Sequence, residues 1–351
     1  MNANDVRMLG LVSLLAGLMT PGLTAAEEAA PEAKTYPTMG SVLRLDPALD
    51  ALIPADAQIE KLAGGFEWAE GPVWNVARQS LFFSDVPRNV IFEWKEGLGT
   101  RDYLYPSGYT GQSYRGKEPG SNGLTLDSQG RLVICQHGNR QVARLESDGS
   151  MTVLARLWKY RRFNSPNDLV YDARGNLYFT DPPYGLARLN DDPAKELLFN
   201  GVYLLRADGK LELLNRELTF PNGVALSPDE KTLYVAISDP DHPAIMAYPV
   251  NDDGLLGAGA CFFDAAPLQA GGKGLPDGLK VDRQGNLFAT GPGGVLVISP
   301  EGKHLGTIQT GEATANCAFG DDGSMLYMTA DMFLCRIRTS TVGSTFGKRG
   351  R

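Results

Sequence analysis

A short sequence motif recurs six times along this chain of 351 residues, with copies about 40 to 55 residues apart. Each copy begins with Glu, Asn or Asp, continues as an apolar segment, turns through polar residues and ends in a second apolar segment. Repetition at this spacing is typical of propellers and solenoids, in which each copy forms one structural unit. The copies are EGPVWNVARQSLFFS (70–84), NGLTLDSQGRLVIC (122–135), NDLVYDARGNLYFT (167–180), NGVALSPDEKTLYVA (222–236), DGLKVDRQGNLFAT (277–290) and NCAFGDDGSMLYMT (316–329).

The second copy shows what one unit can form. Apolar residues alternate with their neighbours in LTL (124–126) and in LVI (132–134), on either side of an Asp-Ser-Gln-Gly turn, which predicts a β-hairpin. A lone hairpin does not bury its apolar face. Each copy leaves space for about four short strands, the size of a propeller blade, and further strands are expected at 202–205 and 294–298. We therefore predict an all-β, six-bladed β-propeller over residues 41–340; a β-sandwich with coincidental hairpins is the alternative.

The first residue of every copy carries a side-chain oxygen. In a propeller the innermost strands face a central channel, so residues that begin these strands would converge at one end of it. Hard oxygen ligands select calcium or magnesium rather than zinc or copper. Asn-Gly and Asp-Gly are also common turn dipeptides, but recurrence at one position of every copy favours a central metal site. The residues are Glu70, Asn122, Asn167, Asn222, Asp277 and Asn316.

Four segments resemble the SMP-30/gluconolactonase family: EGPVW (70–74), SPNDL (165–169), PNGVALSPD (221–229) and LPDGLKVD (275–282). CQHGNR (135–140) and TDPPYG (180–185) are similar to its bacterial gluconolactonase branch, and the resemblance covers residues 66–329. It implies a six-bladed propeller with one catalytic divalent cation, calcium being favoured. By motif position the ligands would be Glu70, Asn167, Asn222 and Asp277, which leaves Asn122 and Asn316 as substrate-binding residues that line the pocket.

The function that we predict from this reading is hydrolysis of a sugar lactone. The cation would act as a Lewis acid on the lactone carbonyl, and Asp277 is the candidate catalytic base. Members of the family also open phosphofluoridate or organophosphate esters, so a phosphoesterase on the same scaffold is the first alternative. A non-enzymatic binding propeller with a structural ion is the second. The physiological lactone and the oligomeric state stay open.

Further substrate-binding candidates lie on loops. His137 and Arg140 follow the second hairpin, and Tyr109 and Tyr184 lie on Gly- and Pro-containing loops where a sugar ring could stack. A solvated loop histidine and tyrosines that anchor their loops are the alternatives. The Gly- and Tyr-rich stretch 103–120 is long enough to be a lid, and we expect it to cover the channel entrance.

The N-terminus is typical of a secretory signal peptide. Residues 8–19 are apolar but too short to span a bilayer as a helix, and small residues precede Glu27. We expect a signal peptide at 1–26, a flexible leader at 27–40 and a polar tail at 341–351. The protein would then be exported, to the periplasm or the medium.

The remaining composition excludes several partners and chemistries. The net charge of −8 argues against nucleic acid as a partner. Apart from the N-terminal segment, no stretch of the sequence is apolar enough to be a candidate membrane span. Motifs of serine α/β-hydrolases, zincins and nucleotide-binding loops are missing from the sequence. The cysteines could form disulfides after export, with Cys317 and Cys335 as the first pair to consider, but free buried thiols are an equal alternative. They are Cys135, Cys261, Cys317 and Cys335.

Overall fold

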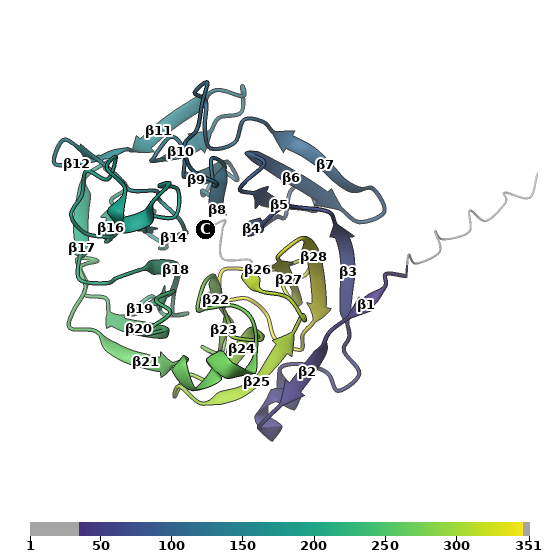
Figure 1. Ribbon diagram of the computed structural model, residues 1–351. Coiled ribbons are helices and arrows are strands. Elements are labelled where there is room, and N and C mark those ends of the chain that lie inside the picture. Colours follow the sequence, from purple (N-terminus) through teal and green to yellow (C-terminus); the bar gives the residue numbers. More distant parts are fainter. Residues whose placement is uncertain (1–34, 347–351) are drawn as a thin grey trace, which may run out of the picture. The chain divides into compact units, whose positions relative to one another are not determined.

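A computed structural model describes residues 35–346, in which six β-sheets are arranged as blades around a central axis (Figure 1). The prediction of an all-β, six-bladed propeller is therefore confirmed. The predicted signal peptide and the last five residues, 347–351, lie outside the described residues. Within the described part, no helix is both long and apolar enough to cross a membrane.

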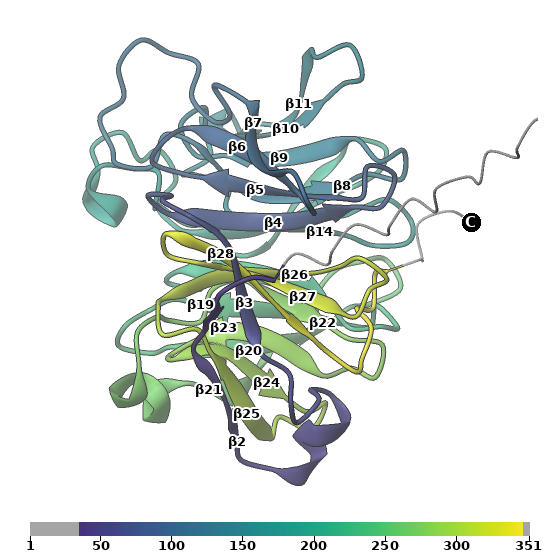
Figure 2. The same cartoon turned by 90° about the vertical axis from the view of Figure 1, so that its right-hand side faces the viewer.

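Each repeated motif forms the two inner strands of one blade, and two more strands lead antiparallel toward the rim (Figure 2). The expected strands at 202–205 and 294–298 are the third strands of their blades. The first four blades are blade 1 (β4 Ala69–Asn75, β5 Ser80–Asp85, β6 Val90–Lys95, β7 Gly99–Leu104), blade 2 (β8 Ser121–Leu126, β9 Leu132–Gln136, β10 Gln141–Leu145, β11 Met151–Ala155), blade 3 (β14 Leu169–Tyr171, β15 Leu177–Asp181, β16 Gly201–Leu205, β17 Leu211–Asn215) and blade 4 (β18 Pro221–Leu226, β19 Thr232–Ile237, β20 Ala244–Pro249, β21 Ala260–Asp264).

The last two blades take strands from the N-terminal part of the chain. In blade 6 the order is β26–β27–β28–β3–β1, so strands of both chain ends share one sheet, and β2 is the outermost strand of blade 5. Blade 5 contains β22 (Leu279–Val281), β23 (Leu287–Gly291), β24 (Gly294–Ile298), β25 (His304–Gln309) and β2 (Ser41–Arg44). Blade 6 contains β26 (Thr314–Gly320), β27 (Met325–Ala330), β28 (Phe333–Arg338), β3 (Ile59–Gly64) and β1 (Thr38–Met39).

Short elements connect the blades. A two-stranded hairpin, β12 (Leu157–Trp158) and β13 (Arg161–Arg162), lies between blades 2 and 3. Within residues 35–346 there are also three 3-10 helices: η1 (Pro47–Ala51), η2 (Leu189–Asp191) and η3 (Ala266–Gly271).

Main-chain pairing reaches into both of the segments expected to flank the propeller. The leader was expected to be flexible to residue 40, but β1 pairs there with β3 (Thr38 with Glu60, Met39 with Ile59). The expected polar tail is packed as far as Phe346, because Gly343 forms a bridge with Asp282 in blade 5. Strand pairing satisfies main-chain groups in both segments, and composition alone does not reveal such pairing.

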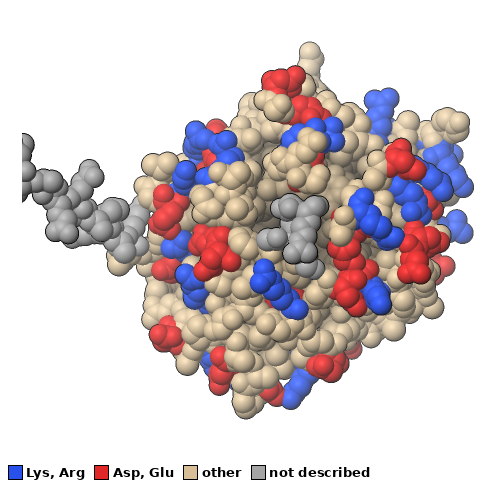
Figure 3. Space-filling view, turned by 180° about the vertical axis from the view of Figure 1, so that it is seen from behind, with Lys and Arg blue, Asp and Glu red and all other residues tan. Residues whose placement is uncertain are grey.

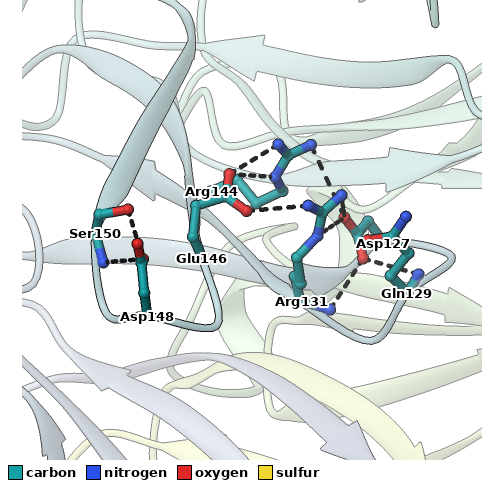
Figure 4. A network of polar contacts seen from close by, with 7 residues as sticks. All are labelled: Asp127, Gln129, Arg131, Arg144, Glu146, Asp148 and Ser150. Atoms are coloured by element: carbon teal, nitrogen blue, oxygen red, sulfur yellow. Dashed lines mark hydrogen bonds and ion pairs between the residues drawn. The ribbon is translucent and has the colours of Figure 1, made fainter.

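The turns of the repeated hairpins are built by an aspartate. Asp127 Oδ1 accepts hydrogen bonds from the main-chain N–H of Gln129 and of Arg131, while Oδ2 accepts one from the guanidinium of Arg131 (Figure 4). Asp172 and Asp282 accept the same two main-chain bonds in blades 3 and 5. A carboxylate that closes its own turn explains why Asp recurs at this point of the repeat.

Every blade buries both of its faces against its two neighbours. In β5, Leu81 and Phe83 belong to the core between blades 6 and 1, whereas Phe82 belongs to the core between blades 1 and 2. Alternate side chains of a strand point to opposite faces, so one apolar strand supplies two cores. Six such clusters fill the six interfaces, and the ring closes where β26 contacts β4.

The four cysteines are unpaired, so the alternative of free thiols is correct and the Cys317–Cys335 disulfide is not formed. Three of them are buried in blade cores and Cys261 is exposed. On the face opposite to that of Figure 1, acidic and basic side chains are interspersed (Figure 3).

The closing sheet depends on Arg336 in β28, whose side chain is 12% exposed. It binds Glu60 of β3 at 2.6 Å and Glu96 of blade 1 at 2.7 Å, and lies over the rings of Tyr36 and Trp94. We predict that Arg336→Ala lowers the free energy of unfolding by about 2 kcal/mol, between the values for exposed and for fully buried ion pairs. Guanidinium unfolding measures this loss.

Arg338 provides the matched control. It lies on the same strand, is 51% exposed, and pairs with the exposed Asp322 at 3.2 Å. Arg338→Ala should cost at most about 0.5 kcal/mol. Equal losses for the two variants would contradict the importance of Arg336 for closure.

Candidate metal centre and substrate pocket

The residues that begin the repeats lie at irregular points of the innermost strands. The strand register shifts directly after Glu70, and between Ser121 and Leu124, around Asn122. An equivalent shift surrounds Asn222, and another lies directly before Asn316. A bulge re-aims a side chain away from the regular alternation of a strand. These four residues are buried, so their polar groups are enclosed at one end of the channel.

The other two residues precede their strands. Asn167 and Asp277 lie two residues before β14 and β22. Each main-chain N–H reaches back to the second strand of its blade, Asn167 to Thr180 O at 2.9 Å and Asp277 to Thr290 O at 3.3 Å. This pairing fixes both residues at the same level as the strand-borne members of the set.

Glycines let the six positions approach one another. A Cβ on Gly71 would lie 2.1 Å from the carbonyl oxygen of Asn122 in the next blade, and a Cβ on Gly223 would lie 2.1 Å from that of Asp277. No side chain fits at such distances. The polar ring, as we call the six residues that begin the repeats, is therefore held in main-chain contact around the channel.

Three oxygens in the polar ring are buried and make no hydrogen bond within residues 35–346: Asn122 Oδ1, Asn222 Oδ1 and Asp277 Oδ1. An unsatisfied buried acceptor costs about 1–3 kcal/mol, so each of these oxygens needs an electropositive partner.

The orientation of Asn222 follows from its neighbours. Ser238 Oγ donates to the carbonyl of Pro276, so it accepts from Asn222 Nδ2 at 2.8 Å, which leaves the amide oxygen of Asn222 as the free atom.

The carboxyl groups of the ring are strongly perturbed. Burial raises the pKa of both Glu70 and Asp277, and the charges of Asp168 and Glu118 raise them further. Glu70 Oε2 accepts from the N–H of Gly71 at 2.9 Å, which partly offsets this effect. Two buried carboxyl groups that resist ionisation are the electrostatic environment that a bound cation relieves.

Sequence reasoning missed Asp168 and Glu118. Asp168 follows Asn167, at the position where four other copies have Gly, and this departure from the repeat was the available signal. Its two oxygens accept from the N–H of Leu169 at 2.9 Å and of Val224 at 3.2 Å. Glu118 comes from a loop outside the repeat, so no sequence signal marked it.

The donor set fits a hard divalent cation. Within the described residues no three His, Cys, Asp or Glu side chains could hold a metal by themselves, so a site here needs amide oxygens. The free oxygens of Asn222 and Asp277, together with Glu70, meet this requirement, and oxygen-only ligands suit calcium.

Asn316 has a different role in this geometry. Its Oδ1 accepts from Cys317 N at 2.9 Å, and its Nδ2 donates to Glu70 Oε2 at 3.4 Å. It therefore orients Glu70.

Of the loop candidates, Tyr184, His137 and Arg140 each have a buried polar atom without a hydrogen bond among the described residues, Arg140 at Nη2. Tyr184 Oη is buried without a hydrogen bond among the described residues, and its electrostatic neighbours include Asp277 and Asn222. Its pKa is raised, mainly by burial. The side chain of His137 is completely buried.

The structure places Arg140 and Tyr109 in anchoring contacts. Arg140 donates from Nε to Phe163 O at 2.6 Å and from Nη1 to Ala194 O at 2.8 Å. Tyr109 Oη donates to Ser113 O at 2.6 Å within its own loop. Both contacts favour loop anchoring over substrate contact.

The stretch expected to be a lid begins after β7 and runs over residues 105–120. It is tied to the blades, since Asn89 Oδ1 accepts from Gly108 N at 2.7 Å and Asn139 N donates to Gly108 O at 2.7 Å. These bonds hold the loop at Gly108 against residues of blades 1 and 2.

Known proteins share most of this sequence. The sequence profile of the SMP-30/Gluconolactonase/LRE-like region matches residues 68–331. The chain belongs to this family. It is 38% identical over 340 residues to a gluconolactonase of Zymomonas mobilis, covering 95% of this chain and 96% of the relative.

Solved structures of the family share the propeller. A gluconolactonase of Xanthomonas campestris superposes with a TM-score of 0.76 at 32% identity, covering 89% of this chain and 99% of that one. A regucalcin of Agrobacterium tumefaciens reaches a TM-score of 0.63 at 20% identity, covering 88% of this chain and 97% of that one, a likeness that shows the fold alone.

The raised pKa values of Glu70 and Asp277 predict how the metal-free protein responds to pH. Because the folded-state pKa lies above the unfolded one, the stabilisation is complete below the unfolded pKa and is lost as pH rises through the folded pKa. Metal-stripped protein should therefore lose stability from about pH 4 upward, as measured by chemical unfolding, and added calcium should restore it.

The control is the double variant Glu70→Gln, Asp277→Asn. It has no such carboxyl groups to ionise, so its stability should depend less on pH than that of the metal-stripped wild type. Identical pH profiles for the two proteins would contradict the assignment.

Proposed function

We propose that this protein is a metal-dependent hydrolase that opens a sugar lactone. One observation carries the proposal: free, buried amide and carboxyl oxygens meet in the polar ring, in a chain that covers 96% of a gluconolactonase relative. The relatives that match part of the chain also include proteins named lactonases.

In this proposal the cation is calcium, held by Glu70, Asn167, Asn222 and Asp277. When bound, it supplies Lewis acidity toward the lactone carbonyl oxygen and offsets the charge of the two carboxylates. Ser238 Oγ accepts a hydrogen bond from Nδ2 of Asn222, which directs the amide oxygen of Asn222 to the opposite side. Asn316 Nδ2 donates to the carboxylate of Glu70 and so orients it.

Asp277 is the proposed base. Its unpartnered Oδ1 is the oxygen offered to the cation, and the carboxylate beside the ion would accept a proton from a water molecule as the water oxygen attacks the carbonyl carbon. The ring C–O bond then breaks, and the released hydroxyl oxygen takes up a proton to leave an open-chain hydroxy acid. Neighbouring negative charges make the carboxyl a stronger proton acceptor.

The test follows proton release from δ-gluconolactone and other lactones, with and without chelator. Wild type should open the lactone only when the cation is present. Asp277→Ala should lose at least about 100-fold in kcat/KM, the usual scale for a general base. The exposed Asp56 supplies the control, and Asp56→Ala should leave the rate unchanged.

The outcomes separate the candidate functions. Lactone opening that survives chelation would overturn the metal-dependent mechanism. Cleavage of organophosphate esters alone would make the protein a phosphoesterase. If nothing is cleaved while calcium still raises Tm, the protein is a binding propeller with a structural ion.

We also propose that the protein is exported and that residues 1–26 are removed. The support is the short apolar segment 8–19 followed by small residues. Mass spectrometry of the protein from fractionated cells should find a mature N-terminus at Glu27 in the periplasm or the medium. Full-length protein in the cytoplasm would overturn this proposal.

A further inference from the structure

A second kind of unsatisfied polar atom lies outside the polar ring. The unpartnered atoms of the ring are oxygens of Asn and Asp, which accept hydrogen bonds and are suited to bind a cation. His137 Nε2 is also buried without a hydrogen bond within the described residues, while Nδ1 lies 3.2 Å from the carboxylate of Glu118. With Nδ1 facing a carboxylate, Nε2 of the neutral imidazole is a hydrogen-bond acceptor, so its missing partner is a donor such as a hydroxyl.

The chain path brings His137 to the ring end of the channel. Asn122 lies at the start of β8, β9 returns antiparallel, and His137 follows the last residue of β9. It therefore lies at the same end as the ring but farther from the axis, since β9 is the second strand of its blade.

Main-chain pairing sets Glu118 beside this histidine. His137 N donates to Gly120 O at 3.1 Å, and Gly138 N donates to Pro119 O at 3.2 Å. The two segments run together like strands, and Glu118 Oε2 lies 3.2 Å from His137 Nδ1. Because main-chain bonds fix the pair, its geometry does not depend on a mobile loop.

Tyr114 links the main chain of Glu118 to blade 3. Tyr114 Oη donates to Glu118 O at 3.0 Å and also contacts Gly185 O, beside Tyr184. Glu118 is close enough to the ring for its charge to raise the pKa of Glu70 and of Asp277. Its side chain is 32% exposed and therefore accessible from solvent.

We propose that Glu118 and His137 form a subsite that recognises hydroxyl groups and thereby selects polyhydroxylated lactones. This inference rests on the proposed lactone-opening function and assigns its substrate preference to two residues. The carboxylate of Glu118 accepts a hydrogen bond from one hydroxyl of the sugar ring, and Nε2 of His137 accepts one from the next. A site built to bond a hydroxyl discriminates strongly against an analogue that lacks it, because its buried polar groups then stay unpaired.

The test compares two lactones with the same six-membered ring: δ-gluconolactone, which carries hydroxyls, and δ-valerolactone, which has none. Glu118→Ala should raise KM for gluconolactone about tenfold, which corresponds to about 1.4 kcal/mol, and change KM for valerolactone less than about twofold. His137→Gln should show the same contrast. In both variants kcat should stay within about twofold for each lactone, because neither residue acts on the reacting carbon.

Asp191 is the matched control, an exposed carboxylate at the end of η2 in the loop that follows β15. Asp191→Ala should leave both KM values unchanged. If Glu118→Ala alters both lactones by the same factor, or neither, the subsite is overturned while the proposed function stands. If wild type opens neither lactone, the proposed function and the subsite fail together.

A binding measurement separates the subsite from an effect on the ion. Calcium affinity, measured by titration without substrate, should change less than about threefold in Glu118→Ala, since a partly exposed charge is screened. A larger loss would mean that Glu118 acts through the cation, and would overturn the subsite.

Discussion

The close approach of the innermost strands is the constraint on which the rest of the structure depends. Glycine follows the ring residue in four of the six copies, and at Gly71 and Gly223 a side chain would collide with the main chain of the next blade. Asn-Gly and Asp-Gly, usually turn dipeptides, here allow strands to touch. At these two positions a larger residue would force adjacent blades apart and disperse the oxygens that the ring collects.

This convergence creates an electrostatic cost that a cation is suited to offset. Two carboxyl groups and several amides are enclosed together, and burial raises the pKa of both acids. Asp168 adds a further buried carboxylate, although two main-chain N–H groups stabilise it. The neutral amides supply coordinating oxygens without further charge, so a ring of this composition can attract a dication and still remain folded without one.

The sequence predicted what is encoded locally and repeatedly. The hairpins, their Asp turns and the six ring residues all follow from short-range alternation and from recurrence. In the pairing of β3 with β28, Lys61 lies opposite Cys335. No local sequence pattern predicts a contact between residues so far apart in the sequence. Glu118 escaped notice for a related reason, because main-chain pairing with residues 137–138 places it and its own neighbours do not. Arg140 and Tyr109 were chosen for chemistry, but they bind main-chain carbonyls nearby.

The sheet that takes strands from both chain ends also has a consequence for the order of folding. Blades 1 to 4 are each continuous in sequence and can pair their strands as they are synthesised. In blade 6, β1 and β3 can pair with each other early, but they join the rest of their sheet only when β28 has been made. Contacts this distant in sequence form slowly. During synthesis, the faces of the blades on either side of the gap stay uncovered, and the nascent chain is at its most vulnerable to aggregation just before the ring is completed.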